Sequence, residues 1–305
     1  MSSVLKIFKK MRPLELVTFV FYSLLTALIL IFNTNIKFWY LLGAANVFII
    51  SSMFVLTDSL DRKPGRFWKV ISYWYPAPLI FITFKEVYLL VRQLNPHDYD
   101  WILIKIDHAI FGVNPTQALY KISHPFLTEV LQIVYSTFYF LPVVLAVSLF
   151  LRKKFEEVDF VIYTVVFGYF FSYVGYLLLP AVGPRFTLHN FEFNNIELPG
   201  LWAANFIREV INSGESIPSG TPNPMAMVQR DVFPSGHTMM TLMVMYLSIK
   251  YKDRTRYLLC IIGSMLIFST VYLRYHYFVD LLGGTLAMVI SMMISKKIYN
   301  RIQQK

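Results

Sequence analysis

The sequence predicts an all-α fold, a polytopic transmembrane helix bundle of about eight spans. Three observations predict it. The chain of 305 residues is 56% hydrophobic and only 15% charged, apolar runs long enough to cross a bilayer recur along it, and no run alternates as strands of a membrane barrel do. Such a composition excludes a soluble domain of this size. Hydrocarbon offers no partner for free backbone groups, so the spans are expected to be helices.

Spanning the bilayer takes about 20 helical residues, fewer where neighbouring helices bury the ends. Cys260 is the single cysteine and lies in an apolar run, so the chain cannot form an intramolecular disulfide. A basic cluster precedes the first run as in a secretory signal, but the run is long and lacks a clear cleavage site, which favours a retained span. The expected spans are residues 14–33, 38–57, 67–84, 127–151, 160–180, 234–250, 257–273 and 278–295.

The positions of lysine and arginine predict the orientation. The N-terminus and segments 62–69, 152–154, 250–256 and 296–305 hold 19 of the 28 basic residues, and all five lie on one side of an eight-span chain. Cytoplasmic connections are enriched in these residues, so both termini are expected in the cytoplasm and the other four connections outside. The net charge of +10 therefore reports membrane orientation rather than nucleic-acid binding.

Two of the outer connections are long. Residues 85–126 mix aromatic and acidic side chains, and residues 181–233 include the partly helix-periodic stretch 198–211. Both are expected to form short interfacial helices that roof a site. We treat residues 1–305 as a single membrane domain, with an N-terminal three-span region at 1–94 and a core at 95–295, because the chain shows no internal repeat and no flexible linker.

Three outer segments concentrate the reactive side chains: 183–185, 233–238 and 274–280. In the Pro-Ser-Gly-His run, Ser235 and Gly236 open a helix whose N-terminus favours an anion, and His237 follows. His276 and Asp280 are four residues apart, so the carboxylate can hold one imidazole proton and free the other nitrogen. Arg185 adds a forked cation that suits phosphate oxygens.

Simpler interpretations exist for each feature alone. The His276–Asp280 pair could only stabilise a helix, and Arg185 could be an interfacial anchor. Segment 217–221 repeats Pro-Ser-Gly without the histidine, which indicates a plain loop. Lys85 and Glu86 are expected at the outer interface rather than on a transport pathway. The histidines without a matched partner are expected to be bystanders: His97, His108, His124 and His189.

These residues resemble the type 2 phosphatidic acid phosphatase superfamily, which three short outer-face motifs define. The second motif is matched in full, whereas Ser269-Thr270 replaces the Ser-Arg of the third and Leu178 replaces the first motif's lysine. The pattern looks more like the inositol phosphorylceramide synthase branch, echoed in Gly-Pro-Arg at 183–185 and in residues 231–237 and 272–280. Segments 106–116 and 135–142 are also similar to that branch.

The resemblance implies that His276 attacks phosphorus to give a phosphohistidine, that Asp280 orients it, and that His237 protonates the leaving oxygen. Arg185, Ser235 and Gly236 would hold the phosphoryl oxygens. Arg274 is the nearest candidate for the missing arginine, although two residues from His276 it would point elsewhere on a regular helix.

The expected substrate is a lipid phosphate, with water or an alcohol as acceptor, and no metal or cofactor is required. The missing cations favour a phosphodiester, which carries one charge, and so favour phospho-headgroup transfer. One alternative is a phosphatase acting on phosphatidic acid, phosphatidylglycerol phosphate or a polyprenyl diphosphate. Another is a non-enzymatic transporter or structural membrane protein. The sequence leaves the oligomeric state open.

Overall fold

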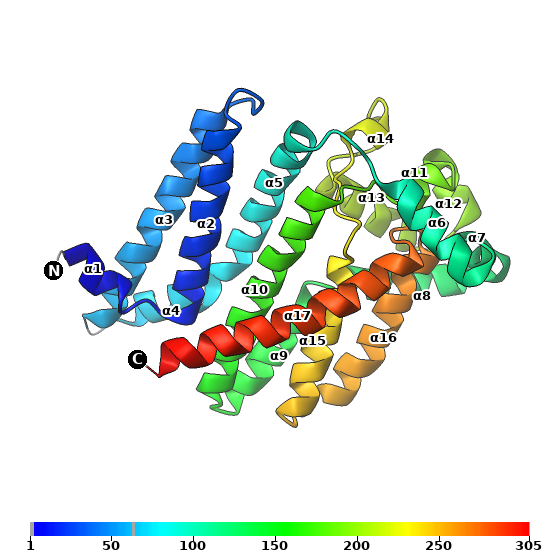
Figure 1. Cartoon of the computed structure of the whole chain (residues 1–305). Coiled ribbons are helices and arrows are strands. Elements are labelled where there is room, and N and C mark those ends of the chain that lie inside the picture. Colours follow the sequence, from blue (N-terminus) through cyan, green and yellow to red (C-terminus); the bar gives the residue numbers. More distant parts are fainter. Residues whose placement is uncertain (1–2, 63–64, 305) are drawn as a thin grey trace. The chain divides into compact units, whose positions relative to one another are not determined.

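The computed structural model describes residues 3–62 and 65–304, and within these ranges it contains helices and no strand. This confirms the all-α prediction for the described residues. The helices are α1 Ser3–Phe8, α2 Pro13–Ile31, α3 Trp39–Asp61, α4 Arg66–Trp74, α5 Pro76–Leu94, α6 Asp100–Phe111, α7 Pro115–Leu119, η1 Tyr120–Ile122, α8 Pro125–Ser136, α9 Phe140–Leu151, α10 Phe155–Leu178, α11 Pro184–Thr187, η2 Phe191–Phe193, α12 Asn194–Glu197, α13 Ala204–Gly214, α14 Pro224–Met227, α15 Gly236–Lys250, α16 Arg256–Tyr272 and α17 Phe278–Gln303 (Figure 1).

Four described helices are long and apolar enough to cross a membrane: α2, α3, α10 and α17. The pair α8 and α9 would make a fifth span if it is counted as one, although its two halves meet at a bend of 56°. The predicted spans at 234–250 and 257–273 become α15 and α16, which have 15 and 17 residues. Several described helices could therefore span a membrane, while the count of eight stays a prediction.

Prolines explain why two predicted spans are interrupted. The expected helix at 67–84 divides into α4 and α5, because α5 begins at Pro76 and Pro78 cannot donate to the carbonyl of Trp74. The expected helix at 127–151 breaks after Ser136. Pro142 has no N–H for the Phe138 carbonyl, so the chain bends before α9 establishes its regular bonding.

The chain forms two compact units. The first comprises Met1–Pro96, Ile162–Phe171 and Ser291–Lys305. In it α2 packs against α3, the hydroxyls of Tyr22 and Thr83 lie 2.6 Å apart, and Asn46 donates to Glu86 at 2.7 Å. Glu86 is buried, which differs from the interfacial position expected from the sequence. Buried polar bonds of this kind hold helices together in an apolar environment.

The second unit comprises His97–Val161 and Ser172–Ile290 and contains all three motif segments. In it α15 and α16 lie side by side, and α16 also packs on α8 (Figure 1). At one end, Arg152 pairs with Asp253 at 3.0 Å, which joins the two basic connections 152–154 and 250–256. At the other end of α15, about 22 Å away by its 15 residues, stand Ser235 and Gly236.

Candidate functional site

The second and third motif segments meet at a pair of histidines. His237 lies in the first turn of α15, and His276 lies in the connection from α16 to α17. Their facing ring nitrogens, Nδ1 of His237 and Nε2 of His276, are 3.4 Å apart. His276 is buried and His237 is half-buried. Two imidazoles far apart in the sequence therefore form one local centre.

The surroundings of His276 fix its tautomer. Its Nδ1 lies 3.0 Å from the backbone carbonyl oxygen of Val232. A carbonyl oxygen can only accept, so Nδ1 carries the proton and Nε2 of the neutral ring holds a lone pair. Burial lowers the pKa of His276 to about 4, against smaller upward effects of the Asp231 charge and the Val232 bond. His276 is therefore neutral at physiological pH, with Nε2 directed at His237.

Asp280 has a different geometry from the one expected. Its Oδ2 lies 3.4 Å from Nδ1 of His276 but accepts a shorter bond, 2.7 Å, from the backbone N–H of Tyr277. This reach back from the third position of α17 is a helix N-terminal cap. Asp280 thus fixes the start of α17 next to His276, while the Val232 carbonyl makes the closer contact with the imidazole. Sequence reasoning missed Val232, because a backbone acceptor leaves no mark in the residue type.

The bend between α8 and α9 supplies an aromatic wall for His237. The Tyr135 ring stacks on the imidazole with a centroid distance of 4.6 Å, and the Phe138 ring lies at 4.2 Å. Both residues flank the break of the helix. Positions three apart in the chain lie on one face of a helical segment, so both rings can reach the imidazole. The aromatic wall of His237 therefore stands where α8 ends.

Close backbone contacts hold the motif segments together. The N–H of Ser235 donates to the carbonyl of Asp280 at 3.1 Å, and the Ser235 hydroxyl caps α15 by accepting from the N–H of Thr238 at 3.2 Å. A Cβ on Gly284 would lie 2.6 Å from the Ser235 carbonyl oxygen. Gly183 has a φ of +95°, and a Cβ there would lie 3.0 Å from the Tyr275 carbonyl oxygen. These glycines allow the three segments to approach.

Arg185 is buried near the start of the second long connection, residues 181–233. Its backbone N–H donates to the Arg274 carbonyl at 3.1 Å, and its guanidinium carbon lies 4.9 Å from the centre of the Tyr275 ring. Nη1 donates to Asn212 at 3.2 Å, and Nη2 pairs with Glu215. The structure therefore brings Arg185 beside the residue that precedes His276, with α13 supplying its polar partners.

The other expected cation points elsewhere. Arg274 has a φ of +68° after the end of α16, and its guanidinium bonds Asn194 at 3.0 Å and pairs with Glu197. Arg274 therefore does not take the place of the missing arginine. Leu178 is 66% exposed, and the Thr270 hydroxyl donates to the Ile267 carbonyl within its own helix. Neither replacement position presents a cation to the histidines.

Helix α6 braces the first and third motif segments. The Asp100 carboxylate accepts from the N–H groups of Val182 and Gly183 at 3.0 and 2.8 Å. The Asp107 carboxylate accepts from the first two N–H groups of α17, those of Phe278 and Val279, at 2.8 and 2.7 Å. Burial raises the pKa of both carboxyls, against the opposing effect of these bonds. Sequence reasoning placed both aspartates in the connection expected to form interfacial helices, and Asp107 also in the segment 106–116 that resembles the synthase branch, but gave neither of them a role.

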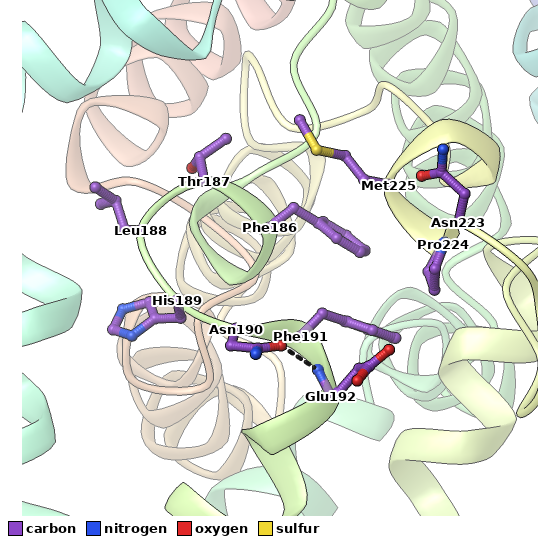
Figure 2. Close-up of a pocket in the computed structure, with 10 residues that line it drawn as sticks. All are labelled: Phe186, Thr187, Leu188, His189, Asn190, Phe191, Glu192, Asn223, Pro224 and Met225. Carbon is purple, nitrogen blue, oxygen red and sulfur yellow. Dashed lines mark hydrogen bonds between the residues drawn. The ribbon is translucent and has the colours of Figure 1, made fainter.

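A pocket of about 660 Å³ opens next to Arg185. Figure 2 shows Phe186 and Phe191 pointing towards Pro224, whereas His189 lies on the opposite side of the segment. The two phenyl rings stack with a centroid distance of 4.7 Å, and the Arg185 guanidinium carbon lies 5.0 Å from the Phe186 ring centre. The wall of this pocket therefore also covers the buried arginine.

Two of the other histidines, His124 and His189, have partners outside the histidine pair. Nδ1 of His124 caps α8 by accepting from the Phe126 N–H, and Nε2 of His189 lies 3.0 Å from the Thr116 hydroxyl. Burial lowers the pKa of His189 to about 4. Ser219, in the loop without the histidine, donates to Glu209. These positions agree with the bystander and loop interpretations.

One helical unit thus brings together a buried and a half-buried histidine and, beside them, a buried arginine, the side chains that the sequence predicts for an anion site of a membrane protein. The family model of the PAP2 superfamily matches residues 101–294, and the chain belongs to this superfamily. It is also 30% identical over 117 residues to a PA-phosphatase related-family protein of Dictyostelium discoideum. That match covers 38% of this chain and 19% of the relative. No solved structure matches the chain.

Proposed function

We propose that this protein is a membrane-embedded enzyme that transfers a phosphoryl group from a lipid phosphate through a phosphohistidine on His276. The observation that carries the proposal is the state of this ring. Its Nδ1 proton is bound to the Val232 carbonyl, its pKa is about 4, and its Nε2 lone pair faces His237 at 3.4 Å. A neutral, oriented imidazole beside a second imidazole suits nucleophilic and acid–base catalysis.

The reaction follows from this arrangement in two steps. The Nε2 lone pair of His276 forms a bond to phosphorus, the bond from phosphorus to the leaving oxygen breaks, and a proton passes from His237 to that oxygen. Burial lowers the pKa of His237 well below its ordinary value, so the negative charge of the bound phosphate has to favour the protonated ring for this step. Water or an alcohol then gives a proton to His237 and attacks phosphorus, and the phosphorus–nitrogen bond breaks. Arg185, the Ser235 hydroxyl and the Gly236 N–H hold the non-bridging oxygens. The scheme uses no metal ion.

The charges around the motifs support a phosphodiester as donor. Arg274 is paired with Glu197, and positions 178 and 270 present no cation. A diester carries one negative charge and a monoester close to two. We therefore propose transfer of a phospho-headgroup of the inositol phosphorylceramide synthase type. Similarity to the PA-phosphatase related-family protein of Dictyostelium discoideum supports a second candidate, a phosphatase of phosphatidic acid.

The test uses the full chain purified in detergent. We expect wild-type protein to form an acid-labile phosphoprotein from a diester lipid labelled at phosphorus, and to pass the label to inositol or water. Substituting His276→Ala should abolish the adduct, because the attacking nitrogen is lost. Substituting His237→Ala should slow its formation by roughly 10²–10⁴-fold, the usual contribution of a general acid. Activity should persist in a chelator.

The outcomes separate the alternatives. His108→Ala is a matched control, because this exposed histidine lies on α6 away from the pair. Strong preference for phosphatidic acid, with water as sole acceptor, would replace headgroup transfer by the phosphatase. If the wild type turns over no lipid phosphate and both histidine variants keep the wild-type phenotype, the protein belongs to the non-enzymatic class.

A further inference from the structure

The Glu215 carboxylate forms an ion pair with the Arg185 guanidinium, the group that would bind the phosphate. Glu215 lies directly after α13 and pairs with Nη2 of Arg185, 30 residues away in the sequence. Asn212, one turn earlier, accepts from Nη1 at 3.2 Å. The Arg185 side chain is 5% exposed and that of Glu215 is 15% exposed. The pair is therefore partly shielded from water, where charges interact more strongly than at an open surface.

Helix α13 has one buried and one exposed side, and the buried side fixes the position of the Glu215 carboxylate at its end. Arg208 and Asn212 lie on one side and are buried, whereas Phe206 and Val210 are 72% and 56% exposed. At the helix start, the buried Glu129 carboxylate accepts from four successive backbone N–H groups, those of residues 201 to 204. Because α13 is anchored at its start and along one side, Glu215 is presented to Arg185 by a fixed element.

The pairing changes the charge that a phosphate meets. Glu215 neutralises Arg185 before any substrate arrives, and Glu197 does the same for Arg274. A bound phosphate group must share Arg185 with Glu215 or displace it. Repulsion from the carboxylate is twice as large for a dianion as for a monoanion at the same position, since Coulomb energy scales with the product of the charges.

We propose that Glu215 is a specificity-determining residue that disfavours dianionic phosphomonoesters and so favours monoanionic phosphodiesters at Arg185. The inference rests on the proposed function for its substrates, but it concerns binding at the arginine and is measurable without turnover. In this proposal Glu215 is the side chain that sets the preference for phosphodiester over phosphomonoester lipids.

The first experiment measures binding of two soluble probes to the purified full chain: inorganic phosphate at about pH 8, where it is largely dianionic, and dimethyl phosphate, a monoanion. Substituting Glu215→Gln keeps the shape and a hydrogen-bond acceptor but removes the charge. We expect its affinity for phosphate, relative to dimethyl phosphate, to rise about tenfold. The ratio compares two ligands on one preparation, so a reduced folded fraction does not change it.

Three further variants sharpen the test. Glu215→Asp keeps the charge and should keep the wild-type ratio. Asn212→Asp adds a second carboxylate beside Arg185 and should shift the ratio in the opposite direction, against phosphate. Glu209→Gln is the matched control, because this residue lies on the same helix, bonds Ser219 and should leave the ratio unchanged.

The second experiment measures turnover. The kcat/KM for phosphatidic acid, relative to that for a diester lipid, should rise about tenfold in Glu215→Gln. An equal loss of both affinities in this variant would show that Glu215 only supports Arg185, and an unchanged ratio would show that it has no influence; either result overturns the inference. If the wild type turns over neither lipid, the proposed function fails, whereas the binding ratio still decides the role of Glu215.

Discussion

His276 owes its reactive form to burial and to one backbone oxygen. The ring loses its water shell, which disfavours the charged form, and its pKa falls to about 4 from 6.5. The neutral form is the nucleophile, so protonation of His276 abolishes attack only below that pH. We therefore predict that the acid limb of the kcat/KM profile, which reports the free enzyme, lies near pH 4 rather than near 6.5. Rates measured across pH 3.5 to 8 check this.

Arg185 enters the same prediction through its charge. It disfavours a second positive charge nearby and so adds to the lowering of the His276 pKa. Neutralising it in Arg185→Gln should move the acid limb upward as well as weaken phosphate binding, because the arginine acts on both. An acid limb near 6.5 in the wild type would mean that water reaches His276, and would contradict the buried, neutral state.

Single residues differ in how well the sequence predicts them. His237, His276 and Arg185 stand at fixed offsets within short motifs, so their proximity followed from placing three segments on one side. The direction of Arg274 did not follow, because its positive φ ends α16 and turns the side chain towards Glu197. Glu215 stood in a long loop without a periodic pattern, and only the fold brings it to Arg185. The catalytic roles of the motif residues stay predictions.

Helix α6 acts on the site through the start of α17. Its Asp107 carboxylate accepts from two N–H groups at the start of α17, directly after the segment that carries His276. The asparagine side chain in Asp107→Asn has only one acceptor oxygen, and its NH₂ group would face one of the two backbone N–H groups. We predict that Asp107→Asn lowers kcat by roughly tenfold with little change in KM, because small displacements of a reacting group are costly.

The comparison for this variant is His108→Ala on the adjacent position of α6, which is exposed and should keep wild-type kcat. The melting temperature of Asp107→Asn should fall, since two charge-assisted bonds are weakened. A variant that melts earlier but keeps kcat at low temperature would show that α6 supports only stability. A higher kcat in Asp107→Glu than in Asp107→Asn would support the role of the carboxylate in positioning the segment that carries His276.

The existence of helices was easier to predict than their interruptions. Apolar composition correctly located α2, α3, α10 and α17, because each of these helices contains one long apolar run. The breaks at Pro76 and before Pro142 were not predicted, since an apolar run with proline can continue as a kinked helix. Tyr135 and Phe138, whose rings lie against His237, stand at the second break, so an unpredicted feature lies next to the site.

The distribution of charge along the chain predicts how the protein lies in a membrane. Within the second unit, connections 152–154 and 250–256 meet through the Arg152–Asp253 pair. Hydrogen bonds from Thr255, Ser148 and Arg152 outweigh burial and lower the pKa of Asp253 to about 2. The pair therefore stabilises the fold above the ordinary carboxyl pKa of 3.8, and this contribution is lost as the pH falls towards 2. The motif segments open at the other end of α15.

We predict that the basic end faces the cytoplasm and the histidine site the opposite side. The test replaces Cys260 by serine and introduces one cysteine, Glu192→Cys beside the pocket or Arg254→Cys in the basic connection; both positions are exposed. An impermeant thiol reagent should label position 192 in intact cells and position 254 only after permeabilisation. Because the two positions lie in one compact unit, labelling in the reverse order would invert the orientation of the site, and labelling of both in intact cells would exclude a span between them.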